Sequence, residues 1–157
     1  MKNKITHITI WVLICLLIGF LSSIATQSSV NDWYLSLNKP VFNPPNWIFA
    51  PVWTLLYILM GISAGIVSAM GFFHNRVKIA LYYFGFQLLF NALWSVVFFG
   101  FRSAFWALLI ILVLLALILA TIRWFKAVSL LSAYLLIPYF LWVCFATALN
   151  YKIWEMN

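Results

Sequence analysis

The sequence is short of charge, and above all of acidic side chains. Only 7% of its 157 residues are charged, and only two of them are acidic, Asp32 and Glu155. Soluble domains carry about 25% charged residues, whereas 67% of this chain is hydrophobic. A soluble fold of this size could not bury so much apolar surface, so lipid is the natural solvent for the chain.

The scarcity of acids and histidines excludes most conventional active sites. Both acids are expected at a membrane edge, so no buried carboxylate pair is available for acid–base catalysis. His7 and His74 lie near the ends of separate apolar segments, and no metal site is predicted from them. No nucleophile with a nearby base and no glycine-rich phosphate loop is present. Cys15 and Cys144 lie within apolar runs and are expected to be free thiols.

The basic residues are present, but they are too scattered to bind nucleic acid. They occur in ones and twos between apolar runs: Lys2, Lys4, Lys39, Arg76, Lys78, Arg102, Arg123, Lys126 and Lys152. A nucleic-acid interface would need them along one face. Charges at the ends of membrane spans are the better interpretation.

Five apolar segments are long enough to cross about 30 Å of hydrocarbon at about 1.5 Å per residue. They lie near residues 6–26, 48–70, 79–100, 104–124 and 129–152. Most of the connections between them are short, which forces neighbouring helices to run antiparallel. We therefore predict an all-α fold, a five-helix integral membrane bundle that forms one transmembrane domain over residues 1–157.

The exception among the connections is the segment of residues 27–47. Prolines at positions 40, 44 and 45 prevent a regular helix through its second half. The segment also contains four aromatic residues: Trp33, Tyr34, Phe42 and Trp47. It is expected to fold back as a lid over one mouth of the bundle, or else to contribute to an interfacial aromatic belt.

The distribution of the cations predicts the orientation in the membrane. The N-terminus and the connections at 71–78 and 123–129 carry six of the nine basic residues. Because cytoplasmic connections are enriched in Lys and Arg, the N-terminus is predicted to be cytoplasmic. The long first loop and the C-terminus then lie on the opposite side.

Two helix faces could line an interior site. Gln87, Asn91, Trp94, Ser95 and Phe98 share one face of the third span. Polar groups are costly in lipid, so this face is expected to point inward. It could provide structural hydrogen bonds between helices or polar groups in an apolar cavity, and the mixture of amide, hydroxyl and aromatic groups favours the cavity.

The fifth span repeats the pattern with Pro138, Trp142, Phe145, Ala146 and Leu149 on one face. A kink at the proline would open space beside it, with the indole as a wall and the small alanine as a recess. Ordinary helix packing remains the alternative for this face.

The second span contains Gly61 and Gly65, whose spacing permits close approach of another backbone. That backbone could belong to a helix of the same chain or to a second copy in a homodimer. Packing within the chain is the commoner case.

Three motifs together resemble a known family. They are WYLSLNKPVFNPPNWIFAPVWTLLY at 33–57, NALWSVVFFG at 91–100 and PYFLWVCFATALN at 138–150. This combination resembles the translocator protein family, also called the tryptophan-rich sensory proteins or peripheral benzodiazepine receptors, and in particular its bacterial members. The resemblance covers nearly the whole chain.

The resemblance implies a five-helix bundle, often a homodimer, that binds porphyrins, haem and isoquinoline- or benzodiazepine-type drugs. By the same resemblance, the protein is expected to require no cofactor and no metal site, since the porphyrin or haem is its ligand. It implies a pocket beneath the first loop, lined by Tyr34, Phe49, Trp53, Asn91, Trp94, Ser95, Trp142, Ala146 and Leu149.

The resemblance leaves three functions open. The first is a tetrapyrrole receptor or sensor. The second is an enzyme that degrades porphyrin in light, in which Trp53 and Trp142 would be catalytic. The third is a porphyrin or lipid transporter, against which the lack of paired intramembrane charges argues. Because Glu155 stands where animal members carry a basic residue, cholesterol is expected to bind poorly.

Overall fold

The computed structural model describes residues 2–157, and every regular element in that range is helical. The elements are, in order, α1 (Lys2–Val30), α2 (Trp33–Ser36), α3 (Asn46–Ala69), α4 (Asn75–Ser95), the π-helical turn η1 (Val96–Gly100), α5 (Ala104–Val128), α6 (Leu130–Leu135) and α7 (Ile137–Met156). Five helical stretches in this part of the chain are long and apolar enough to cross a membrane. The predicted all-α fold with five spans is confirmed.

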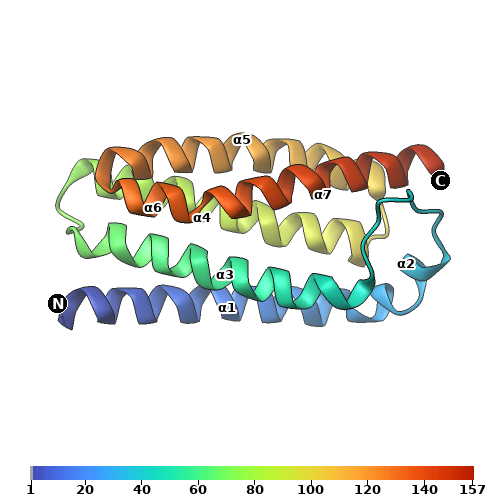
Figure 1. Cartoon of the computed structure of the whole chain (residues 1–157), viewed down its shortest axis with the longest axis horizontal. Helices are drawn as coiled ribbons and strands as arrows, with labels where there is room; N and C mark the ends of the chain where they lie inside the picture. The colour runs from blue at the N-terminus through green and yellow to red at the C-terminus, as the bar shows by residue number, and fades with distance from the viewer. Residues whose placement is uncertain (1) are drawn as a thin grey trace.

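The long helices lie side by side as a bundle, with the chain ends at opposite ends of it (Figure 1). The N-terminus lies near the α3–α4 connection and the end of α5, whereas α2 and the loop after it lie near the C-terminus. The first helix continues to Val30, so the expectation that residues 27–30 belong to the loop was wrong. A helix bonds its own backbone groups, and the polar side chains of this last turn are accommodated at the mouth of the bundle.

The contact between α1 and α3 depends on the two glycines of the second span. A Cβ added to Gly61 would lie 2.4 Å from the Cα of Val12, and one added to Gly65 would lie 2.4 Å from the Cα of Ile8. The small residues therefore serve packing within the chain. Since α1 covers them, they are not available to a second copy.

The other long helices are ended or bent by local features. After η1, Arg102 adopts a left-handed backbone conformation with φ 55°, and the Ser103 side chain accepts a hydrogen bond from the Trp106 N–H at the start of α5. The last span is divided at Leu136 into α6 and α7, with Pro138 in the first turn of α7. A proline is tolerated there because that turn lacks helical partners for its N–H groups.

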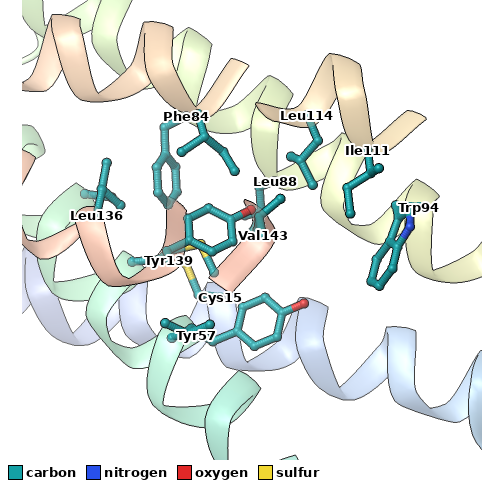
Figure 2. Packing of buried hydrophobic residues seen from close by; sticks show 14 of the residues in the cluster. Cys15, Tyr57, Phe84, Leu88, Trp94, Ile111, Leu114, Leu136, Tyr139 and Val143 are labelled. Atoms are coloured by element: carbon teal, nitrogen blue, oxygen red, sulfur yellow. The ribbon is translucent and has the colours of Figure 1, made fainter. Parts of the chain in front are cut away.

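Buried apolar side chains from all the long helices fill the middle of the bundle. Figure 2 shows Tyr139 among them, with Phe84 and Leu136 nearby and Trp94 farther along the bundle. Tyr139 and Phe84 are fully buried. The middle of the bundle is therefore filled by side chains.

Candidate ligand-binding cavity

A cavity of about 480 Å³ opens at the end of the bundle that carries α2 and the first loop. This volume lies within the range of small-molecule sites, which is about 300–1,000 Å³. The residues expected to line a pocket all lie on its wall: Tyr34, Phe49, Trp53, Asn91, Trp94, Ser95, Trp142, Ala146 and Leu149. The structure thus brings together residues from four elements, α2, α3, α4 and α7, while their role in holding a ligand stays a prediction.

Aromatic rings from four elements form one wall of this cavity. The Trp53 ring of α3 lies 6.2 Å from the Trp94 ring of α4, which lies 5.8 Å from Phe98 in η1. Phe49 lies 6.1 Å from Trp142 of α7. These separations are typical of favourable ring pairs, each of which contributes about 0.5–1.5 kcal/mol beyond its burial. The rings therefore hold one another in place and present a rigid apolar surface.

The first loop and α2 close the cavity through Tyr34, which is buried. Its ring lies 5.6 Å from Phe99 and 6.4 Å from Phe49, so it packs on both η1 and α3. Its hydroxyl donates to Asn43 Oδ1 over 2.9 Å. Burial raises the pKa of the Tyr34 phenol and this hydrogen bond offsets part of the rise, so the hydroxyl remains a donor at physiological pH.

The loop is also bonded to the end of the last helix. The Asn38 N–H donates to Asn157 Oδ1 over 3.1 Å, and Asn157 Nδ2 donates back to the Asn38 carbonyl over 2.9 Å. Lys39 Nζ donates to the Tyr34 carbonyl over 2.8 Å. Trp47, by contrast, is 74% exposed and is suited to the membrane interface.

Below the cavity, a chain of hydrogen bonds joins α3, α4 and α7. Tyr57 donates to Asn91 Oδ1 over 3.1 Å, and Asn91 Nδ2 donates to the Tyr139 hydroxyl over 2.8 Å. Tyr139 donates in turn to Gln87 Oε1 over 2.7 Å. Gln87 is buried and does not reach the cavity, so the cavity interpretation was wrong for it, and its role is to bond neighbouring helices.

Asn150 fixes the orientation of Trp94, and the sequence analysis missed it. Trp94 Nε1 donates to Asn150 Oδ1 over 2.9 Å, while Asn150 Nδ2 donates to the Ala104 carbonyl at the start of α5 over 2.8 Å. An amide within an apolar span was the available signal, because such a group must find partners inside the bundle.

Trp142 is the exception among these polar groups. Its Nε1 is buried and finds no hydrogen-bond partner among residues 2–157. Its ring is held by Phe49 and by Phe145, whose ring lies 5.4 Å away. A buried donor without a partner costs about 1–3 kcal/mol, so the site lacks an acceptor at this point.

The sequence analysis also missed the contribution of α1. Its last turns place Gly19, Ser22, Ser23, Thr26, Gln27 and Val30 on the cavity. Ser22 and Thr26 are buried, and their spacing of four places them on one helix face. The run of polar residues within an otherwise apolar span was the signal. The cavity therefore has polar lining residues from α1 in addition to its aromatic wall.

The fifth-span face differs from the expected one. Pro138 is exposed and points away from the interior, so its inclusion was wrong. The fully inward positions of α7 include Tyr139, Val143 and Ala146. The buried face of α7 is centred one residue after Pro138, on Tyr139 and Val143, so counting from the proline set the predicted face one position out of phase. Trp142 and Leu149 still line the cavity, and Phe145 packs on Phe42 of the loop at 6.1 Å.

Among residues 2–157, no charged side chain, histidine or cysteine lines the cavity. Over residues 2–157, no three His, Cys, Asp or Glu side chains lie close enough together to hold a metal ion. The cavity wall offers indole, phenol, hydroxyl and amide groups to a ligand. The fold and site together define a multi-pass membrane protein with an aromatic cavity under a proline-rich loop.

Comparison with known proteins identifies the family. Residues 11–155 match the model of the TspO/MBR family, and the chain belongs to that family.

Individual relatives come from bacteria, archaea and animals. "Tryptophan-rich protein TspO" of Chlorobaculum tepidum is 38% identical over 157 residues, or 100% of this chain and 99% of that protein. The protein of the same name from Archaeoglobus fulgidus is 42% identical over 93% of this chain and 94% of its own length. "Translocator protein" of Homo sapiens is 40% identical over 80% of this chain and 75% of its own length.

Proposed function

We propose that the protein is a membrane receptor or sensor for tetrapyrroles such as protoporphyrin and haem, and that isoquinoline-type drugs bind at the same place. The observation that carries this proposal is the aromatic cavity under the first loop, which Trp142 lines with an indole whose buried Nε1 has no partner among residues 2–157. A flat apolar molecule would stack on the wall, and an acceptor on its edge would bond to this indole once the ring turns Nε1 toward the cavity. Membership of the TspO/MBR family supports the same class of ligand.

The two sides of the cavity support an amphipathic ligand. The rings of Trp53, Trp94 and Phe98 offer faces and edges to a planar macrocycle. Ser22 and Thr26 offer hydroxyls that can bond to polar substituents at its rim. The cavity volume of about 480 Å³ suits one such molecule rather than several.

Titration of the purified protein with protoporphyrin tests the proposal through quenching of tryptophan fluorescence. Trp142→Phe keeps the ring and removes the donor, so the affinity is expected to fall about two- to tenfold, as for one lost hydrogen bond. Trp106→Phe is the matched control because Trp106 is 61% exposed and lies outside the cavity. Equal affinities for the wild type and both variants would contradict the proposal.

Light-dependent porphyrin degradation is a second candidate, favoured by the contacts of Trp53. Its ring lies 5.8 Å from Tyr57 and 6.4 Å from Tyr139, so an indole that gives an electron to an excited porphyrin has oxidisable neighbours. This function requires product formation in light beyond the bleaching of free porphyrin. The double variant Trp53→Phe, Trp142→Phe should abolish it, and equal bleaching with an unrelated membrane protein would exclude it.

We propose that the N-terminus is cytoplasmic, so that the cavity opens toward the opposite side. The basic residues of the N-terminal end, among them Arg76, Lys78 and Lys126, support this orientation. A homodimer is proposed from the family alone. Because Gly61 and Gly65 are covered by α1, its interface must use another face.

A further inference from the structure

A second hollow lies on the outside of the bundle, near the end of α5 that is remote from the cavity. This outer groove has a volume of about 590 Å³ and is lined by Tyr83 of α4 and by Leu119, Ala120, Arg123, Trp124 and Ala127 of α5. The Tyr83 and Trp124 rings stack, with centroids 6.3 Å apart and planes inclined by 16°. The groove thus combines an aromatic wall, an apolar floor and one cation.

The charge of this end of the molecule is not balanced within the chain. The only two acidic side chains belong to the other end, where Asp32 lies 3.9 Å from Arg102 and Glu155 lies 2.9 Å from Lys152. Arg123 and Lys126 therefore have no carboxylate to pair with. Their counter-charge has to come from outside the chain.

The position of Arg123 fits the level of the lipid phosphates. It lies about 7 Å before the end of α5, counted at about 1.5 Å per residue. Arginines at this depth keep their stem along apolar surface and extend the guanidinium to the interface. Trp and Tyr, which form the groove wall, are enriched at the same level.

We propose that the outer groove binds one anionic phospholipid of the surrounding bilayer. The Arg123 guanidinium holds the phosphate by charge-assisted hydrogen bonds, and one acyl chain lies along Leu119 and Ala120 beside the stacked rings. An anionic headgroup is favoured over a zwitterionic one because no acid stands near the groove to pair with a headgroup amine. Basic pockets at the cytoplasmic ends of membrane helices are a recurring form of lipid site.

Native mass spectrometry of the full-length protein in detergent tests this proposal. The protein is given equal amounts of dioleoyl phosphatidylglycerol and dioleoyl phosphatidylcholine, which have the same chains and differ in headgroup charge. The wild type should retain one phosphatidylglycerol in preference. Arg123→Gln should lower its apparent affinity about tenfold, the effect of losing a direct charge-assisted contact.

Two further variants distinguish a built site from general attraction. Lys126→Gln removes the same charge from the same helix, but at a side chain that does not line the groove, and it should change the affinity less than about twofold. Ala127→Trp keeps every charge and fills the groove from an exposed position, and it should weaken binding as strongly as Arg123→Gln. Circular-dichroism melting in the same detergent verifies that each variant is folded.

Three outcomes would overturn the proposal. One is an equal fall in the affinity for phosphatidylglycerol in Arg123→Gln and Lys126→Gln, of the roughly fivefold size expected for a single charge near an anionic surface. Another is unchanged binding in Ala127→Trp. The last is equal retention of the two lipids by the wild type.

Discussion

Two tryptophans of the cavity show how the same residue type takes different roles. The Trp94 indole is bonded to Asn150 and is part of the structural network, whereas the Trp142 indole has no partner within the described chain. A bonded indole resists rotation and supports the wall. The unbonded indole has a donor that no protein group uses, which a ligand would reach once the ring turns, and this is why Trp142 rather than Trp94 is the residue to substitute first.

Two glycines of α3 should also be sensitive single positions. Gly61→Ala would force a Cβ against the backbone of α1, and overpacking of this kind costs about 1–3 kcal/mol. Gly85→Ala is the matched control, because a Cβ there meets nothing within 4 Å and removing a mid-helix glycine should stabilise by about 0.5–1 kcal/mol. The melting temperature in detergent should therefore fall in Gly61→Ala and rise in Gly85→Ala. A fall of equal size in both variants would contradict the packing described.

At the scale of the elements, the connection of residues 31–45 has few hydrogen bonds between its own backbone groups. It is held by Tyr34 in the bundle and by the paired bonds between Asn38 and Asn157. Pro40 and Pro44 cannot donate backbone hydrogen bonds, so side-chain contacts determine where the loop lies.

Removing the Asn157 amide should loosen the loop without disturbing the spans. Asn157→Ala deletes both bonds to Asn38, so amide exchange of residues 37–43 should become faster, by about three- to tenfold for about 1 kcal/mol of lost local stability. Asn75→Ala, at the opposite end of the bundle, should leave that segment unchanged. Hydrogen–deuterium exchange with mass spectrometry measures both, and identical protection in the two variants would show that the asparagine pair does not hold the loop.

The helical spans could be predicted well and their inner faces only in part. Runs such as residues 104–128 are so apolar that hydropathy alone identifies them. The end of α1 was misread because polar residues after Gln27 resemble a connection. The inward face of α7 was misread because Pro138 was taken as an inward position, whereas the buried residues begin with Tyr139. Which side of a helix is buried depends on how it is rotated against its neighbours, and a residue count along the chain does not include that rotation.

At the scale of the whole molecule, the two ends differ in charge. One end carries the cavity, the loop and both acids, while the other carries Arg76, Lys78, Arg123 and Lys126. The proposed receptor site and the proposed lipid site therefore lie at opposite membrane surfaces. A ligand and a bound lipid would not compete for the same residues.

Labelling from outside intact cells tests the orientation of the two ends. Val41 is fully exposed in the first loop and Phe73 is 80% exposed in the α3–α4 connection, so each can be replaced singly in a Cys15→Ala, Cys144→Ala background. A membrane-impermeant maleimide should label Val41→Cys in intact cells and Phe73→Cys only after lysis. The reverse pattern would place the N-terminus outside.

The sequence by itself determined that the chain is a membrane protein with five spans and that Asn91 and Trp94 of the third span face the interior. These properties follow from composition and from spacing within one helix, which are local. Only the tertiary structure decided that Gln87 and Asn150 join helices and that Trp142 stays unpaired, because a hydrogen bond such as Trp94 to Asn150 joins helices far apart in the chain. Such pairs depend on how each helix is rotated against its neighbours.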